Sequence, residues 1–323
     1  MESKKIIVTA RSFGKADDEA EKLLVQHGYE VVKLPTQGGT LEEQLPAQLK
    51  EAAGVIAGLE PYTEQMIKGA PHLKVISRYG VGYDKVDCAA AKEAGVLVTI
   101  TPGANGDSVA DLAMALMLAS ARNISFMDAS LKAGDAKRPS GLEMCQKTVG
   151  IIGVGRIGKG VARRCSGFGM KILLYDAYYQ DQEFASQMGA AYTDLDTIIA
   201  EADFITIHAD LNESTRHMFG AEQFKKMKKT AVIVNTARGG IIDEDALYEA
   251  LKEGEIYGAG LDVTVCEPAS SSPLCSLSNC ILTPHAGAAT QEASSKMSYM
   301  AAQNVIEALE TGSCRFAVKE CLR

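Results

Sequence analysis

Three polar side chains in the second half of the chain are of the types that a hydride transfer to a ketone requires. Arg238, Glu267 and His285 each follow an apolar, strand-like run. Imidazole, with a reference pKa of about 6.5, can give a proton to the alkoxide that develops. A carboxylate on its other ring nitrogen fixes the tautomer, and a guanidinium binds a substrate carboxylate through two parallel hydrogen bonds. We therefore predict that His285 is the acid/base, Glu267 its partner and Arg238 the carboxylate clamp.

Other interpretations of these residues stay open on sequence grounds. Arg238 could pair with Asp243 or Glu244, and an exposed pair of that kind contributes only about 0–1 kcal/mol. The histidine and the glutamate could be structural or solvated groups. His208, which also follows an apolar run, is a rival proton donor, and otherwise we expect it beside a cofactor.

The stretch 148–160, TVGIIGVGRIGKG, predicts a dinucleotide-binding turn. Gly153, Gly155 and Gly158 follow an apolar run and precede a helical pattern. In such turns the first glycine permits a tight bend, the second lets a pyrophosphate approach the backbone, and the third lets the helix pack on the strand. Asp176 ends the next apolar run, where an acidic side chain binds the adenosine ribose. Because a carboxylate repels a 2′-phosphate, we predict NAD rather than NADP. A turn whose glycines serve packing alone is the alternative.

A second glycine loop, 77–84, follows the apolar run 73–77. Its backbone N–H groups could hold a small carboxylate, as backbone nests do. A plain glycine turn is an equally good interpretation of this loop by itself.

Strand-like and helix-like segments alternate along the chain, which predicts parallel sheets covered by helices on both faces. We expect strands at 5–9, 29–34, 54–57, 73–77, 96–99, 149–152, 171–175, 202–208, 231–235 and 257–263. We expect helices at 16–27, 41–53, 109–122, from 156 onward, and at 222–228, 243–254 and 291–310. The Gly/Pro-rich stretch 101–106 predicts a hinge between two domains. The helix at 109–122 is apolar almost all round, so we expect it to be buried between domains or against a second subunit.

Bulk properties narrow the class of protein. The 323 residues suit two domains, and the formal net charge of −8 argues against a general affinity for nucleic acid or an anionic membrane. We expect a cytoplasmic location, because the start lacks a signal-peptide pattern and no apolar run approaches the ~20 residues of a membrane span. The eight cysteines form no Cys-x-x-Cys pair, so we predict reduced thiols, no disulfide framework and no metal site.

The order of YGVGYD, NGDSVAD, GIIGVGRIGKG, LLYD, VNTARGGIIDEDAL, GLDV, EP and TPHAG resembles that of the D-isomer-specific 2-hydroxyacid dehydrogenases, especially their phosphoglycerate-dehydrogenase-like branch. The resemblance covers nearly the whole chain. It implies an α/β fold with two doubly wound domains, a Rossmann-type NAD-binding domain (102–292) inserted in a flavodoxin-like substrate domain (1–101 and 293–323). It also implies a homodimer and the interconversion of a small D-2-hydroxy acid with its 2-keto acid.

The resemblance further implies roles for residues at matching positions. Arg238, Glu267 and His285 would be catalytic, as above. The substrate site would also include Val81, Gly82 and Asn105. The cofactor site would be formed by Gly153, Gly155, Arg156, Ile157, Gly158, Asp176, His208, Ala209, Thr236, Ala237, Asp262 and Gly287.

The sequence departs from the family pattern in places that bear on the substrate. Phosphoglycerate enzymes often carry an arginine after the strand near Gly58, where this chain has Glu60. Arg11, Arg78, Lys137 or Arg138 could supply the positive charge instead. Because the sequence ends soon after the last predicted helix, we expect no serine-sensing domain of the kind found in longer relatives. Phosphoglycerate is our first expectation, with hydroxypyruvate or glyoxylate second.

A protein of another class fits the same motifs. The family includes transcriptional corepressors, so a non-catalytic, NAD-sensing interaction protein is the rival hypothesis. The joint presence of a guanidinium, a carboxylate and an imidazole favours the enzyme.

Overall fold

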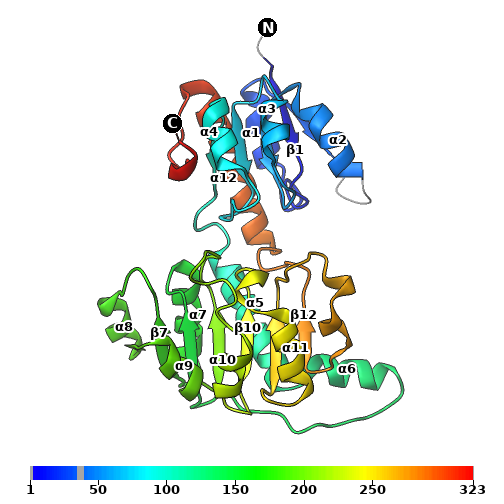
Figure 1. Cartoon of the computed structure of the whole chain (residues 1–323). Helices are drawn as coiled ribbons and strands as arrows, with labels where there is room; N and C mark the ends of the chain where they lie inside the picture. The colour runs from blue at the N-terminus through cyan, green and yellow to red at the C-terminus, as the bar shows by residue number, and fades with distance from the viewer. Residues whose placement is uncertain (1–2, 35–39, 323) are drawn as a thin grey trace. The chain divides into compact units, whose positions relative to one another are not determined.

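The computed structural model describes residues 3–34 and 40–322. The chain folds into two compact units (Figure 1). The terminal unit is formed by Met1–Asn105 and Ala289–Arg323, and the central unit by Gly106–Ala288. Each contains one sheet of parallel strands with helices around it, as the predicted α/β class requires. The units divide at residues 105 and 288, a few residues inside the predicted boundaries.

The terminal unit contains a five-stranded sheet of order β2-β1-β3-β4-β5, the flavodoxin-like arrangement. Its strands are β1 (Lys5–Val8), β2 (Glu30–Lys33), β3 (Ala52–Ala57), β4 (Val75–Arg78) and β5 (Leu97–Thr99). Its helices are α1 (Glu19–Gln26), α2 (Thr40–Leu49), α3 (Glu64–Lys68), α4 (Cys88–Ala94) and α12 (Gln291–Thr311). Helix α12 comes from the far end of the sequence and packs on α1, β3 and β4.

The central unit contains a seven-stranded sheet of order β12-β11-β10-β9-β6-β7-β8. Its strands are β6 (Thr148–Ile152), β7 (Lys171–Tyr175), β8 (Ala191–Tyr192), β9 (Phe204–Ile207), β10 (Val232–Asn235), β11 (Gly258–Leu261) and β12 (Cys280–Leu282). Its helices are α5 (Gly106–Ala121), α6 (Ile124–Lys132), α7 (Arg156–Gly167), α8 (Gln182–Met188), α9 (Leu195–Glu201), α10 (Ala221–Lys226) and α11 (Glu244–Lys252). Read from β8, the order is that of a Rossmann sheet with one strand added.

The strand order reverses once in each sheet, between β1 and β3 in the terminal unit and between β6 and β9 in the central unit. Parallel α/β sheets bind ligands outside the carboxyl ends of their strands at such switch points. The residues that follow these four strands therefore lie where ligands are expected.

Several predicted element limits were wrong. The helix predicted at 41–53 ends at Leu49, because Ala52 and Ala53 already belong to the buried strand β3. The helices α3, α4, α6, α8 and α9, which have five to nine residues each, were not predicted. Four of these begin at a capping side chain, for example Asp181, which accepts from the N–H of Phe184.

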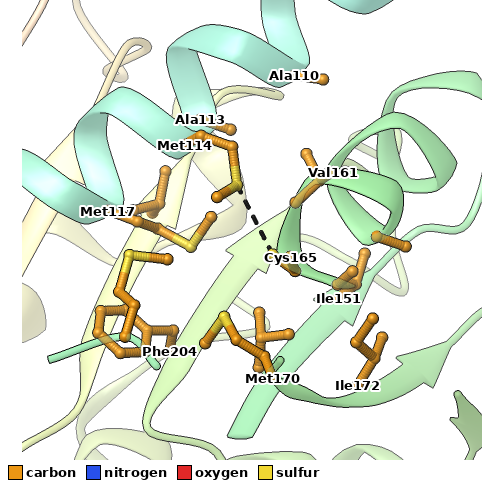
Figure 2. Close-up of a cluster of buried hydrophobic side chains, with 14 of the residues drawn as sticks. Ala110, Ala113, Met114, Met117, Ile151, Val161, Cys165, Met170, Ile172 and Phe204 are labelled. Atoms are coloured by element: carbon orange, nitrogen blue, oxygen red, sulfur yellow. Dashed lines mark hydrogen bonds between the residues drawn. The ribbon is translucent and has the colours of Figure 1, made fainter. Parts of the chain in front are cut away.

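Helix α5 is buried inside its own unit, which corrects one prediction. It packs on α7, β10 and β11 of the central sheet. Figure 2 shows Met114 and Met117 of α5 facing Cys165 of α7, with Sγ of Cys165 3.6 Å from Sδ of Met114. Burial raises the pKa of the Cys165 thiol to about 12. The apolar surface of α5 therefore needs no second domain or subunit to cover it.

The thiol prediction was wrong for one pair. Cys88 at the start of α4 and Cys321 in the last turn of the chain form a disulfide across 233 residues of sequence. Their Cα atoms lie 4.6 Å apart, and Cys321 is almost fully buried. Cysteine spacing alone could not show this pairing, because it depends on the chain end packing against α4.

Among the described residues, no single helix is both long and apolar enough to cross a membrane. Helices α5 and α6 meet that test only as a pair, with a bend of 63° between them.

Candidate active site

Arg238, Glu267 and His285 follow three neighbouring strands of the central sheet. Strands β10, β11 and β12 are parallel and adjacent, so their carboxyl ends meet at one edge. The structure therefore carries all three predicted catalytic residues on loops that leave the same edge of one sheet.

His285 and Glu267 are in direct contact. Nδ1 of the imidazole lies 3.1 Å from each carboxylate oxygen of Glu267. Their side chains are 28% and 23% exposed, so both are shielded but reachable. With the carboxylate on Nδ1, we assign the proton there and the substrate-facing role to Nε2.

The loop that carries His285 is anchored by Asp262. Its carboxylate accepts from the hydroxyl of Thr283 at 2.6 Å and from the backbone N–H groups of Ala286 at 2.7 Å and Gly287 at 2.8 Å. Asp262 is only 2% exposed. His285 has φ = 52°, an uncommon conformation for a residue other than glycine. The buried carboxylate thus fixes the backbone on both sides of a strained histidine, a function that the sequence did not reveal.

Arg238 lies on a tightly held loop after β10. Its Nη1 donates to the carbonyl of Ala237 at 2.7 Å, and Nδ2 of Asn235 donates to the carbonyl of Arg238 at 2.8 Å. A Cβ added to Gly239 would lie 2.1 Å from the carbonyl carbon of Thr264. The Arg238 loop and the segment that leads to Glu267 therefore cross at a distance that only glycine allows. Sequence reasoning missed Asn235 and Gly239, although an Asn-x-x-x-Gly stretch after a strand was a usable signal.

Two carboxylates near this loop have structural partners. Asp243 accepts from the N–H of Ala246 at the start of α11, and Glu244 accepts from the N–H of Val265 at 2.6 Å. Both were predicted as alternative partners of Arg238. Their observed bonds cap a helix and fasten the segment before Glu267.

The three glycines of the first loop differ in what surrounds them. At Gly153, with φ = +86°, an added Cβ would lie 2.6 Å from the carbonyl carbon of His208, and at Gly158 it would lie 2.1 Å from the oxygen of Gly153. At Gly155 it would meet no protein atom within 4 Å. The first and third glycines therefore serve close packing, whereas the second leaves the backbone open to a ligand at the N-terminus of α7. Arg156 and Ile157 are the first residues of that helix.

Asp176 follows β7 and is bound to backbone donors. One oxygen accepts from the N–H of Val154 at 2.8 Å, and the other from those of Tyr178 and Tyr179 at 3.0 and 3.1 Å. Burial raises the pKa of this carboxyl, but the three N–H donors outweigh it, and the net pKa is lowered. A charged carboxylate is thus held against the glycine loop, where a ribose is expected.

His208 does not suit the role of proton donor. Burial lowers its pKa to about 3. Its two ring nitrogens lie 2.9 Å from Oγ1 of Thr206 and 3.2 Å from Oγ1 of Thr236. The ring is therefore neutral near pH 7, and His208 stands across the β6/β9 switch point from Gly153. Ala209, Thr236, Ala237 and Gly287 likewise lie on loops after β9, β10 and β12.

The predicted substrate residues outside this edge belong to the terminal unit. Val81 and Gly82 lie on the loop after β4, and Asn105 is the last residue of the first segment. Nε of Arg78 donates to the carbonyl of Gly82 at 2.9 Å, which fixes the loop. Val81 is 38% exposed.

A cavity of about 810 Å³ in the terminal unit does not coincide with this site. It is lined by residues that precede strands, such as Lys4, Lys74 and Val96. It therefore opens at the amino ends of the sheet, opposite the edge where such sheets bind ligands.

Comparison with known proteins identifies the family. The sequence profile of the D-isomer specific 2-hydroxyacid dehydrogenase, NAD binding domain, matches residues 114–287, within the central unit. The chain belongs to the D-isomer-specific 2-hydroxyacid dehydrogenase family. This confirms the predicted family, the NAD cofactor and the NAD-dependent enzyme class.

Similar proteins of this family differ in length and in name. A D-3-phosphoglycerate dehydrogenase of Methanocaldococcus jannaschii is 46% identical over 87% of this chain, but the match spans only 54% of that protein. A hydroxypyruvate reductase of Thermotoga maritima is 44% identical over 79% of this chain and 84% of the relative. The solved structure of protein TT0316 from Thermus thermophilus aligns over 97% of this chain and 99% of that chain, with a TM-score of 0.86 and 33% identity.

Proposed function

We propose that this dehydrogenase interconverts a small D-2-hydroxy acid and its 2-keto acid, with His285, Glu267 and Arg238 as the reacting and binding groups. The observation that carries the proposal is the Glu267–His285 pair on loops after adjacent strands of an NAD-binding unit. In this assignment the terminal unit is the substrate domain and the central unit the NAD-binding domain.

The chain's own residues handle the proton and the substrate carboxylate. In the direction of reduction, Nε2 of His285 gives its proton to the carbonyl oxygen as the carbon accepts hydride. Glu267 on Nδ1 stabilises the imidazolium that exists before this transfer. Arg238 holds the substrate carboxylate, so the carbonyl carbon is placed for attack. In the direction of oxidation, the same imidazole accepts the hydroxyl proton.

The residues of the first glycine loop fit NAD. Gly155 leaves the backbone open at the N-terminus of α7, where N–H groups and the helix dipole favour a pyrophosphate. Asp176 stands where the ribose hydroxyls would lie. When bound, the nicotinamide supplies or takes the hydride. His208, Ala209, Thr236, Ala237, Asp262 and Gly287 would surround the rest of the dinucleotide.

The test is a coupled panel of substrates. NADH absorbance is followed with glyoxylate, hydroxypyruvate and 3-phosphohydroxypyruvate, and NAD reduction with the matching D-hydroxy acids. We expect turnover with at least one keto acid and a preference for NADH over NADPH. If no 2-hydroxy or 2-keto acid is turned over and NAD promotes capture of a protein partner, the rival hypothesis of a non-catalytic, NAD-sensing interaction protein is correct.

We also propose a homodimer, supported by helix α6. This helix has no buried residue, and Ile124 and Leu131 are 51% and 69% exposed. Exposed apolar side chains on one helix are typical of an interaction surface. Sedimentation analysis should give twice the chain mass, and Leu131→Asp should shift the species toward monomer. The cytoplasmic location stays a prediction, to be checked by cell fractionation.

A further inference from the structure

The switch point of the terminal sheet carries a carboxylate. Thr9 follows β1, and Gly58 and Glu60 follow β3, so the three residues face each other across the point where the strand order reverses. Oε1 of Glu60 accepts from the hydroxyl of Tyr62 at 2.6 Å, from the N–H of Gly58 at 3.0 Å and from the hydroxyl of Thr9. Three donors on one oxygen show that this oxygen acts purely as an acceptor.

The second oxygen of Glu60 is differently placed. Among the residues that the structure describes, Oε2 has no hydrogen-bond partner. A Cβ added to Gly58 would lie 2.8 Å from Oε2, so this oxygen sits directly over the Gly58 backbone. Glu60 is also partly exposed. One oxygen thus fixes the side chain, and the other is available to a ligand at the carboxyl edge of the sheet.

The guanidinium of Arg78, the nearby positive charge, is more deeply buried than the Glu60 carboxylate. Arg78 is 6% exposed, and its guanidinium donates to the carbonyls of Gly82 at 2.9 Å and of Gly58. It therefore ties the Gly58 loop to the predicted substrate loop. The Glu60 carboxylate is therefore the more accessible of the two charges to a ligand at this edge.

Tyr62 is a lasting hydrogen-bond donor to this carboxylate. Burial raises the pKa of the fully buried Tyr62 well above its usual value, and the charge of Glu60 raises it further. The phenol therefore stays protonated and continues to donate to Oε1.

We propose that Glu60 determines specificity in this enzyme: its Oε2 accepts a hydrogen bond from a hydroxyl of an unphosphorylated 2-keto acid, and its charge repels the phosphorylated analogue. The inference rests on the proposed function and deepens it. A repulsive element against a competing ligand is a common source of specificity, and it acts most strongly where the site is partly dry. It places the phosphorylated substrate, our first expectation from the sequence, behind hydroxypyruvate-like acids.

The experiment compares kcat/KM for hydroxypyruvate and 3-phosphohydroxypyruvate in three proteins: the wild type, Glu60→Gln and Glu30→Gln. Glutamine keeps an acceptor at the Oε1 position and removes the charge. Glu30 is an exposed carboxylate at the amino end of β2, so its variant makes the same charge change away from the site. We expect the wild type to prefer hydroxypyruvate, Glu60→Gln to shift the ratio toward the phosphorylated acid by at least about tenfold, and Glu30→Gln to leave it unchanged.

A second measurement uses only the wild type, so it tests the proposal even if the Glu60→Gln variant fails to fold. Glycolate should inhibit at a lower concentration than phosphoglycolate, because the added phosphate meets the carboxylate. A wild-type preference for the phosphorylated keto acid, or an equal ratio in the two variants, would overturn the role of Glu60 and leave the proposed function intact. Absence of turnover with every 2-keto acid would instead overturn the proposed function, and this inference with it.

Discussion

The two switch points of this protein share a topology and differ in chemistry. Across β6 and β9, Gly153 packs against the backbone of His208, and Gly155 leaves N–H groups open. Across β1 and β3, the side chains of Thr9 and Glu60 fill the same topological position. The first arrangement favours an anion and the second disfavours one. We therefore expect strand order to determine where a ligand binds, and the residues that follow the strands to determine the charge of that ligand.

The strongest test of this comparison is His285→Ala in the central unit. If that unit carries the chemistry, turnover should fall by about 10²- to 10⁴-fold, the usual contribution of a general acid. NAD should bind with unchanged affinity, measured by calorimetry, because the change lies outside the glycine loop. Turnover within a factor of two of the wild type would remove His285 from the mechanism.

Gly158→Ala should destabilise the central unit by about 3 kcal/mol or more, because the new Cβ would press on the Gly153 carbonyl. Gly155→Ala is the matched control. Its Cβ meets no protein atom, so stability should change little while the Kd for NAD rises about tenfold. Urea unfolding and calorimetry separate the two effects. Equal losses of stability in both variants would contradict the distinct roles of these glycines.

Arg238→Gln should lower kcat/KM by about 10- to 100-fold, since a hydrogen bond to a charged group contributes about 1.5–3 kcal/mol. We expect a higher KM together with a lower kcat. Lys252→Gln, an exposed change of the same charge on α11, should be neutral. Steady-state kinetics that match the wild type would rule out the carboxylate clamp.

The smallest expected effect concerns acid stability. The folded-state pKa of His208 is about 3, below the reference value of about 6.5. Between these values the unfolded chain binds a proton that the folded chain does not. Stability should therefore fall as the pH drops below about 6.5, by up to about 1.4 kcal/mol per pH unit. His208→Gln should flatten this slope in urea unfolding at pH 7.5, 6 and 5, and an unchanged slope would assign the loss to other groups.

Much of the fold could be predicted because its signals are local. The runs that became β6, β7, β9 and β10 are short and mostly apolar, so their type and order followed from the sequence. The boundaries of the elements were harder to predict where a helix is followed closely by a strand, as between Leu49 and Ala52. The Cys88–Cys321 bond and the elements that cover α5 could not be predicted, since each depends on which segments pack together.

The sequence allowed a prediction of the reacting groups and not of the residues that support them. Arg238, Glu267 and His285 could be named because their residue types suit a known chemistry after apolar runs. Asp262, Asn235 and Gly239 act on loop backbones, and a sequence does not show which N–H groups a carboxylate will bind. The position of Oε2 of Glu60 likewise follows from three hydrogen bonds between separate strands.

The anchoring of residues 283–287 by Asp262 has a consequence for the timing of the reaction. The backbone of His285 has a left-handed conformation, and the buried carboxylate of Asp262 binds the N–H groups of the two residues that follow. The histidine is therefore already oriented when the protein folds. The free energy needed to place His285 in this backbone conformation is spent during folding, and it is not spent again in each catalytic cycle. Inhibitors that contact the imidazole should therefore find the same ring geometry in resting and working enzyme.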